Sequence, residues 1–252
     1  MKLTVLGSGT VVPDGMRNSS GYFLEVPPVG LMIDCGAGTV HALARYGLPW
    51  ERMTHVFVSH FHADHVGELA SLLFAFKWGM KTTRGEPLTL LGPIGLERLV
   101  ADLDHALGLR LGELRFPIQC RELAPAERHE LAPGCTLSVA KTPHTWNSLA
   151  VRIDEGSRSI CYTGDTGYSD EVGIFFDGTD LMISECSFEK PKPGVPHLSI
   201  SEVAMMARQA RAARLVVTHF YFDVDEAVLA DQLRLGYSGQ VLIGTDGLVL
   251  EV

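Results

Sequence analysis

The sequence lacks several features that mark specialised classes of protein. It contains no run of 18 apolar residues, and its start, Met1 to Gly7, reads as a strand without the hydrophobic region of a signal peptide. Its five cysteines form no C-x-x-C pair, and their odd number leaves one without a partner. We therefore expect a soluble, cytoplasmic protein with reduced thiols. Cys186, beside Glu185 at a strand end, is the one cysteine that the sequence places near a candidate site, and its role stays open.

Positive charge is also scarce. Lys and Arg number 21 against 30 Asp and Glu, so the formal net charge is −9. This balance argues against broad attraction to nucleic acid or to an anionic membrane surface. It still permits a small anionic substrate, because bound dications would reverse the local potential inside a cleft.

Histidine, in contrast, is concentrated in one place. His60, His62, Asp64 and His65 put four potential metal ligands within six residues, directly after the apolar run Val56–Val58. Residues at i and i+2 of an extended chain point the same way, so His60 and His62 can reach one ion while Asp64 and His65 face a second. The competing interpretation is a solvated loop with an aspartate cap. The helical H-E-x-x-H motif of many zinc proteases is absent.

The pattern of apolar residues predicts an α/β protein, which we expect to form one domain over residues 1–252. The expected strands are Leu3–Leu6, Tyr22–Val26, Leu31–Ile33, Val56–Val58, Leu88–Leu91, Cys135–Ala140, Leu149–Ile153, Ser159–Tyr162, Leu181–Ser184, Arg214–Thr218, Val241–Ile243 and Leu248–Val252. The expected helices are Thr39–Tyr46, a segment from Val66 to Phe76, Ile94–Leu107, Ser199–Ala212 with a capping box, and Val224–Arg234. Several strands are apolar throughout, as in sheets covered on both faces, which favours a four-layer αββα sandwich over an open sheet.

Three further polar side chains follow expected strands. His144, Asp165 and His219 each occupy a loop after a β-like segment. Taken singly, each would more often be an ordinary loop or core residue. The remaining histidines, which we expect to be structural or exposed, lie on helix-like segments (His41, His105), at a strand start (His55) and in a charged loop (His129).

The ordered set His60-x-His62-x-Asp64-His65, His144, Asp165 and His219 resembles the metallo-β-lactamase fold superfamily over essentially the whole chain. The resemblance implies that His60, His62 and His144 hold one ion, that Asp64, His65 and His219 hold the other, and that Asp165 bridges them. Zinc is the first expectation, while iron or manganese would also accept these ligands. Two cations about 3.5–4 Å apart would generate a bridging hydroxide as the nucleophile.

Within the superfamily, further motifs resemble ribonuclease Z and its phosphodiesterase relatives. They are Leu6-Gly7-Ser8-Gly9-Thr10 with Pro13 and Arg17-Asn18-Ser19, Asp34-Cys35-Gly36-x-Gly38-Thr39, Leu91-Gly92-Pro93, Ser184-Glu185, His197-Leu198-Ser199 and Thr218-His219-Phe220. The resemblance makes His197 a catalytic residue that is not a ligand, near the scissile phosphate. Glu185 would orient His197 or a ligand, and Asp64 could also accept a proton from the nucleophilic water.

Two departures argue against tRNA 3′-end processing. Ribonuclease Z commonly carries a long arm between the positions of His144 and Asp165, which here are only 21 positions apart. In the Asp34-Cys35-Gly36-x-Gly38 motif, this chain has Ala37 where ribonuclease Z has an acidic residue. It has Val40 where that family has glutamine. A small or short phosphodiester is therefore the preferred substrate, with folded RNA not favoured.

Other functions remain open from the sequence. The same metals could serve a lactone, thioester or sulfate-ester hydrolase, or a ribonuclease Z-type endonuclease that lacks the arm. A noncatalytic metal-binding or nucleic-acid-binding module is the alternative from another class. Resemblance to the ribonuclease Z group also suggests a homodimer, while no membrane partner is expected.

Overall fold

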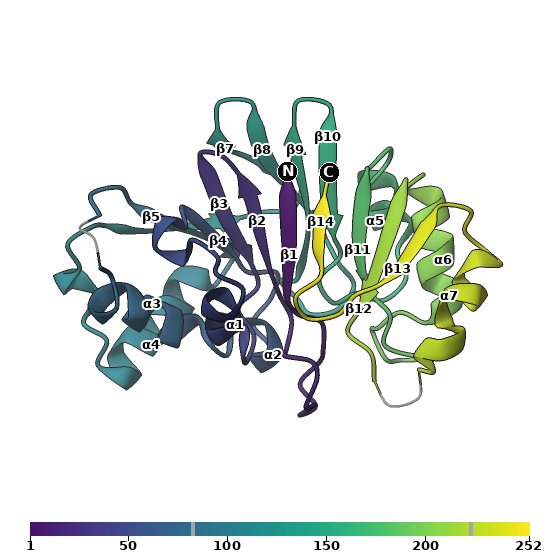
Figure 1. Cartoon of the computed structure of the whole chain (residues 1–252), viewed down its shortest axis with the longest axis horizontal. Coiled ribbons are helices and arrows are strands. Elements are labelled where there is room, and N and C mark those ends of the chain that lie inside the picture. Colours follow the sequence, from purple (N-terminus) through teal and green to yellow (C-terminus); the bar gives the residue numbers. More distant parts are fainter. Residues whose placement is uncertain (82–83, 222–223) are drawn as a thin grey trace.

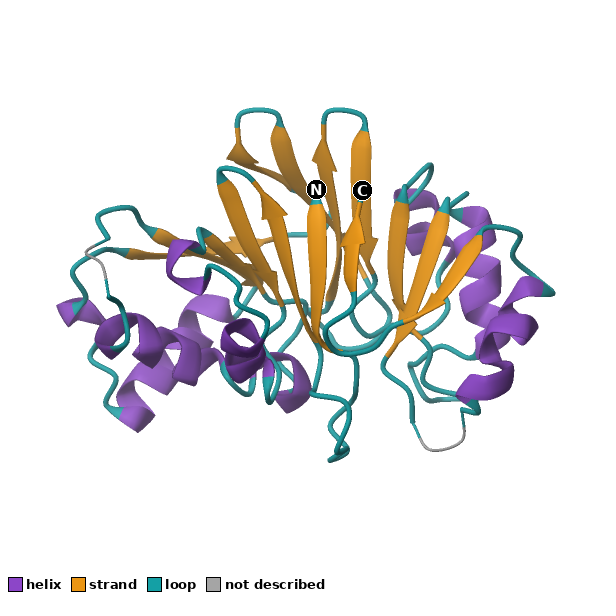
Figure 2. Ribbon diagram, in the orientation of Figure 1, coloured by secondary structure: helices purple, strands orange, loops and turns teal. Residues whose placement is uncertain are grey.

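The computed structural model describes residues 1–81, 84–221 and 224–252. Two seven-stranded mixed sheets pack face to face, with helices on both outer faces (Figures 1 and 2). The expected four-layer αββα sandwich is confirmed. No helix within the described ranges is long and apolar enough to cross a membrane.

The first sheet has the order β14-β1-β2-β3-β4-β5-β6. Its strands are β1 (Lys2–Gly7), β2 (Gly21–Val26), β3 (Val29–Ile33), β4 (His55–Phe57), β5 (Leu88–Pro93), β6 (Ile118–Leu123) and β14 (Val249–Glu251). The second sheet has the order β13-β12-β11-β10-β9-β8-β7. Its strands are β7 (Arg128–Ala132), β8 (Cys135–Lys141), β9 (Leu149–Glu155), β10 (Arg158–Tyr162), β11 (Leu181–Glu185), β12 (Arg214–Thr218) and β13 (Gln240–Ile243).

Each sheet has helices on its outer face (Figure 2). Beside the first sheet are α1 (Thr39–Arg45), α2 (Ala63–Val66), α3 (Leu69–Trp78) and α4 (Leu96–Leu107), with 3-10 turns η1 (Trp50–Arg52) and η2 (Leu111–Glu113). Beside the second are α5 (Asp170–Phe175), α6 (Ile200–Gln209) and α7 (Glu226–Arg234). Three apolar clusters fill the spaces between these four layers. The interior strands β4 and β12 carry apolar residues on both faces for that reason.

Strand direction determines where a site can form. Each sheet contains four neighbouring parallel strands. They are β3, β4, β5 and β6 in the first sheet and β10, β11, β12 and β13 in the second. Their carboxyl ends meet at the lower edge in Figure 1, while the β7–β8 and β9–β10 hairpins project from the upper edge. Open α/β sheets bind ligands at such carboxyl ends.

Most of the expected elements are present, and the differences have local causes. The helix expected from Val66 begins only at Leu69, and the expected bend around Asp64 and His65 is the short helix α2; the two are separate because the Glu68 N–H donates to the Cys35 carbonyl (2.9 Å) instead of continuing α2. The capping box at Ser199 is present, but α6 ends at Gln209, and Arg211 takes a positive φ of 47°.

Two strands, β6 and β7, and two short α-helices, α2 and α5, were not expected from the sequence. The edge strands β6 and β7 alternate polar and apolar residues and carry many charges, so they read as loops. His129 is therefore in strand β7, and the expectation of a charged loop there was wrong. The short helix α5 was missed because its six residues contain little helical periodicity.

Candidate metal centre

The expected ligands all lie where strands end at one edge of the sandwich. His60 follows β4, Asp165 follows β10 and His219 follows β12. His144 follows β8, which runs in the direction of β10 because both strands are antiparallel to β9. The fold thus brings four distant segments to one place.

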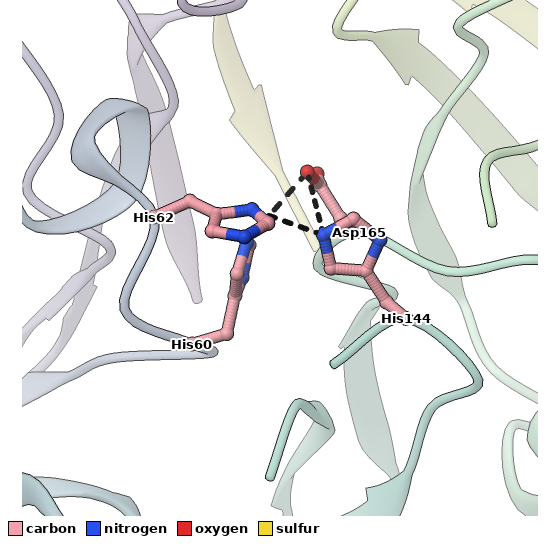
Figure 3. A group of neighbouring side chains, drawn as sticks. All are labelled: His60, His62, His144 and Asp165. Atoms are coloured by element: carbon pink, nitrogen blue, oxygen red, sulfur yellow. Dashed lines mark hydrogen bonds and ion pairs between the residues drawn. The ribbon is translucent and has the colours of Figure 1, made fainter. Parts of the chain in front are cut away.

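The first candidate group consists of His60, His62, His144 and Asp165, whose possible ligand atoms all lie within 4.8 Å of one another. His60 Nε2 and His144 Nε2 are each 3.7 Å from Asp165 Oδ2. His62 Nδ1 is 3.1 Å from His144 Nε2. In Figure 3 these ring nitrogens and the carboxylate converge on a common space.

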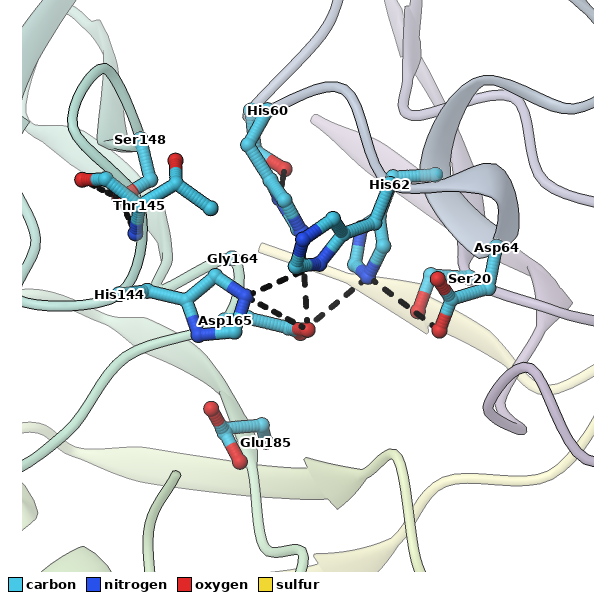
Figure 4. Close-up of polar contacts among 12 residues, drawn as sticks. Ser20, His60, His62, Asp64, His144, Thr145, Ser148, Gly164, Asp165 and Glu185 are labelled. Atoms are coloured by element: carbon cyan, nitrogen blue, oxygen red, sulfur yellow. Dashed lines mark hydrogen bonds and ion pairs between the residues drawn. The ribbon is translucent and has the colours of Figure 1, made fainter. Parts of the chain in front are cut away.

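The second candidate group consists of Asp64, His65, Asp165 and His219, also within 4.8 Å, and all four are buried. The other carboxylate oxygen, Asp165 Oδ1, faces this group, at 3.2 Å from His65 Nε2 and 3.4 Å from His219 Nε2. Asp64 Oδ2 is 3.3 Å from His219 Nε2. Asp64 lies on the opposite side of Asp165 from His144 in Figure 4. Asp165 therefore turns one oxygen toward each group, as a bridging carboxylate would.

Buried polar atoms without partners indicate that these groups fit metal ions. His60 Nε2, His65 Nε2 and Asp165 Oδ1 are buried and make no hydrogen bond to any described residue. Leaving a buried polar atom unpaired costs about 1–3 kcal/mol, so three of them in one place would be unfavourable without a ligand. Imidazole nitrogens and carboxylate oxygens are ligands of zinc, and also of iron and manganese. The two groups are thus consistent with a dinuclear metal site.

Asp34 is an important neighbour of the second group that sequence reasoning did not assign. Its Oδ2 lies 2.7 Å from His65 Nδ1 and accepts from Tyr162 Oη (2.9 Å), while Oδ1 accepts from the Ser59 N–H (2.7 Å). A proton on His65 Nδ1 leaves Nε2 with its lone pair toward Asp165. Asp34 has a positive φ of 55°, which helps turn its carboxylate under the ligand segment.

The glycine-containing loop after Asp34 packs against the segment that carries His60, His62, Asp64 and His65. A Cβ on Gly36 would lie 2.1 Å from the Asp64 carbonyl oxygen, so only glycine allows this approach. The Cys35 N–H donates to the His65 carbonyl at 2.7 Å. The motif therefore positions ligands, where the sequence showed only a turn or a close backbone approach.

Two other histidine rings are oriented by oxygens outside the groups. His144 Nδ1 lies 3.0 Å from the Pro196 carbonyl oxygen, which can accept its proton and leave Nε2 free to bind. His219 Nδ1 lies 3.1 Å from Ser187 Oγ, and the same hydroxyl donates to Glu185 Oε2 at 2.6 Å. Ser187 was not singled out from the sequence, because a serine two residues after a strand carries no distinctive signal.

Charge and burial act against each other throughout the centre. Burial alone would raise the pKa of Asp165, but the surrounding histidines, led by His219, outweigh it and hold that pKa well below its usual range. Burial would lower the pKa of His65, yet Asp165 and Asp34 raise it well above its ordinary value. For His60, burial dominates and lowers the pKa. In the absence of a cation, these carboxylates favour protonated histidines beside them. A bound metal ion can replace those protons and balance the same negative charge.

His197 and Glu185 lie beside the two groups. His197 Nδ1 is 3.0 Å from Glu185 Oε1 and 4.0 Å from Asp165 Oδ2. Glu185 also accepts from the Thr166 N–H (2.6 Å) and the Leu198 N–H (3.2 Å), so its position is fixed. Burial would lower the pKa of His197, but the hydrogen bond and charge of Glu185 raise it above the ordinary value. The structure thus brings this expected pair together.

The other singled-out residues lie elsewhere. His41, His55, His105 and His129 belong to none of the groups found among the described residues. All five cysteines are free, and Cys186 is buried in the core between the second sheet and its helices. Burial raises the pKa of Cys161 to about 12, in keeping with a thiol that is a small core residue.

Tyr221, two residues after His219, is a neighbour of the centre that sequence reasoning missed. Its ring centroid is 5.7 Å from that of His219 and 6.0 Å from that of His197. Burial and then the carboxylates of Asp64, Asp165 and Glu185 raise its pKa to about 12. Its place directly after the Thr218-His219-Phe220 motif was the only available signal.

Comparisons with known proteins agree with this site. The model of one protein family, described as anti-Pycsar protein Apyc1, matches residues 1–236. The chain is 30% identical to the probable metallo-hydrolase YhfI of Bacillus subtilis, with 100% of both proteins covered. It is 24% identical to a ribonuclease Z of Mycobacterium bovis over 98% of this chain and 96% of that protein.

Solved structures give the same picture of the fold. The metallo-β-lactamase fold protein YhfI from Bacillus subtilis has a TM-score of 0.86 at 27% identity, covering 100% of this chain and 98% of that one. The short form of human tRNase Z has a TM-score of 0.84 at 24% identity, covering 100% of this chain and 99% of that one.

The fold and the two histidine and aspartate groups, together with these matches, define a metal-dependent hydrolase of the metallo-β-lactamase fold. The expected membership of this superfamily, among relatives of ribonuclease Z, is confirmed. Within that class, the chain belongs to the anti-Pycsar protein Apyc1 family.

Proposed function

We propose that the protein hydrolyses small phosphodiesters, with cyclic nucleotides as the preferred class, at a centre of two divalent cations. His60, His62 and His144 would hold one cation, Asp64, His65 and His219 the other, and Asp165 both. Family membership supports an activity on a small phosphoester. Zinc is the proposed metal, because four nitrogen and oxygen atoms within 4.8 Å suit its four-coordinate sites. When bound, such cations lower the pKa of water and neutralise phosphoryl charge.

The pairing of His197 with Glu185 is the observation that carries the proposal. His197 is beside both candidate groups, yet its Nδ1 is engaged by Glu185 at 3.0 Å. Its raised pKa keeps the imidazolium present to higher pH than for a free histidine. A protonated His197 would stabilise charge on the phosphoryl oxygens or donate its Nε2 proton to the leaving oxygen.

Asp64 has a second part in the proposal. Its Oδ2 faces His219 Nε2 at 3.3 Å, and its Oδ1 engages in no hydrogen bond among the described residues. A carboxylate with an uncommitted oxygen can accept the proton of the attacking water. The hydrogen bond to His219, working against burial, lowers the pKa of Asp64 and so keeps it ionised.

The connection between His144 and Asp165 supports a small substrate. It contains only β9 (Leu149–Glu155) and β10 (Arg158–Tyr162), which form a tight antiparallel hairpin directed away from the ligand edge (Figure 1). Nothing in this interval forms an arm that could grip the distant elbow of a tRNA. The net charge of −9 adds to this argument against folded RNA.

A substrate panel tests the proposal directly. Metal-loaded protein would be assayed with 3′,5′- and 2′,3′-cyclic nucleotides, an activated aryl phosphodiester, a lactone, a thioester, an aryl sulfate and a precursor tRNA. We expect turnover of the diesters, with cyclic nucleotides best. Preference for the lactone, thioester or sulfate would contradict the proposal, and preference for the precursor tRNA would indicate a ribonuclease Z activity.

A histidine variant tests the role of His197. His197→Ala should lose turnover of the diesters by about 10²- to 10⁴-fold, as for a general acid, while it keeps its metal. His105→Ala, an exposed helix histidine, is the matched control and should match the parent. Undiminished turnover in His197→Ala would remove the basis of the phosphodiesterase assignment.

A further inference from the structure

Tyr221 is fixed in place by contacts with three neighbouring rings. Its ring meets those of His219 and His197 edge-on, at interplanar angles of 73° and 66°. Phe188, which also contacts the His197 ring, stacks on Tyr221, with centroids 5.6 Å apart and planes inclined by 24°. Such packing restricts the rotamer of the phenol. The ring of Tyr221 is therefore held in one orientation beside the candidate metal centre.

The backbone of Tyr221 is also tied to the centre. Its N–H donates to the Ser187 carbonyl at 3.3 Å. The hydroxyl of the same Ser187 contacts both Glu185, at 2.6 Å, and His219 Nδ1, at 3.1 Å. Movement of Tyr221 would thus disturb Ser187, which contacts His219, and Glu185, which contacts His197.

The phenol hydroxyl, in contrast, is uncommitted. None of the hydrogen bonds among residues 1–81, 84–221 and 224–252 involves Tyr221 Oη, and this oxygen is not one of the buried unpaired atoms. It is therefore reachable by solvent, in keeping with a half-buried residue. The three nearby carboxylates that act on Tyr221, those of Asp64, Asp165 and Glu185, do not accept its proton. A fixed donor that the centre itself does not use is available to a ligand.

We propose that Tyr221 is a catalytic residue, which donates a hydrogen bond from its phenol to a non-bridging phosphoryl oxygen of the substrate beside His197. The identity of the substrate rests on the function proposed above. A free phenol has a pKa of about 10, so it remains a donor at neutral pH. A donor held in position before the reaction stabilises developing charge without reorganisation. An anionic oxygen is the matching acceptor, because the hydrogen bond to a charged group is the stronger kind.

Removal of one oxygen atom tests this role. Tyr221→Phe keeps the ring and its packing, so kcat/KM for the diester that wild type hydrolyses best should fall by about 10- to 100-fold. Metal content and thermal midpoint should stay at the wild-type values. Tyr237→Phe is the matched control, because Tyr237 donates to the Ala212 carbonyl (2.7 Å) before β12, at the end of that strand remote from His219. That control should leave kcat/KM unchanged.

Phosphate binding separates this inference from the substrate assignment. Calorimetric titration of inorganic phosphate into the metal-loaded proteins should give a Kd for Tyr221→Phe about 10-fold or more above that of wild type. If wild type hydrolyses no diester but phosphate binding still depends on the hydroxyl, the proposed function fails and the role of Tyr221 stands. If Tyr221→Phe equals wild type in phosphate affinity, or loses metal, the role is overturned, even when diesters are hydrolysed. Absence of both phosphate binding and diester turnover in wild type would overturn both.

Discussion

The two candidate ligand groups differ in how far they are open to solvent. In the first group His62 is exposed, although the side chains of His60 and His144 are only 0% and 3% exposed, whereas Asp64, His65 and His219 of the second group are all buried. Asp165 belongs to both and is buried. A substrate can therefore approach from the side of the first group, and the second group forms the floor of the centre.

The two groups also differ in how they are supported. His65 is held by Asp34 at 2.7 Å and His219 by Ser187 at 3.1 Å. In the first group His60 and His144 also have partners, Ser59 Oγ and the Pro196 carbonyl, at 3.0 Å each. The difference lies in His62. Among the described residues, the only hydrogen-bond contact of the His62 ring is with His144, another member of its own group. Burial with fixed partners favours tight binding of a cation, while an open, lightly supported ligand favours exchange with substrate. We expect the second group to bind its cation more tightly than the first.

The largest effect should follow from a change in the residue that the groups share. Asp165→Asn keeps the shape of the side chain but removes the charge that both groups face, so both cations should be lost and turnover should fall by about 10⁴-fold or more. Elemental analysis together with turnover measures this. Asp170→Asn, an exposed residue of α5, is the control. Retention of two cations by Asp165→Asn would break the view that one carboxylate serves both groups.

A change in the partner of His65 should affect only the second group. Asp34→Asn removes the charge that fixes the His65 ring, and loss of such a partner lowers metal affinity by about 10- to 100-fold. The cation that the parent binds more tightly should be released first from Asp34→Asn, and stepwise titration with a chelator measures this order of release. An unchanged order of metal release would contradict the comparison between the groups.

The comparison should also appear in the stability of the metal-free protein. His65→Ala removes the cationic neighbour of the buried Asp34 and one of the histidine neighbours of the buried Asp165, so it should lower the free energy of unfolding by about 1–3 kcal/mol. His62→Ala changes an exposed residue and should stay within about 0.5 kcal/mol of the parent. Denaturant unfolding of the three metal-free proteins gives both values. Equal losses would mean that burial does not distinguish the groups.

The same contrast explains what the sequence could predict. The residue types of both groups and their order along the chain were readable, because each ligand follows an apolar strand and strand ends meet at one edge of a parallel sheet. The pairing of Asp34 with His65 was not readable, since it depends on a positive φ at Asp34 and on contact between two loops. Local patterns carry no information on such contacts.

The fold shows the same limit. Strands with continuous apolar runs, such as β4 and β12, were predicted to within a residue or so, because burial on both faces leaves a clear pattern. The edge strands β6 and β7 were missed, because one side of each faces solvent and accepts charged residues. The free hydroxyl of Tyr221 could be found only from its neighbours in space.

The smallest effect should come from a histidine outside both groups. His55 opens β4, the strand whose carboxyl end leads to His60, and it is buried beside Thr54, whose hydroxyl lies 2.8 Å from His55 Nδ1. Burial, then the charges of His129 and Arg84, lower its pKa to about 4. With an unfolded pKa of about 6.5, the unfolded chain binds more protons between these two values. The contribution of neutral His55 to stability is thus complete above pH of about 6.5 and is lost as the pH falls toward about 4.

A proton titration of His55 by NMR in the metal-free protein measures this pKa. Because His55 makes no contact with either group, His55→Gln should flatten the acid side of the stability profile and leave metal content and turnover unchanged. A measured pKa near the ordinary value of about 6.5 would show that burial at this strand does not suppress protonation. In that case burial would also fail to explain why the pKa of His60 is lowered. The difference between the two ligand groups would then depend on the hydrogen-bond partners of their histidines and not on burial.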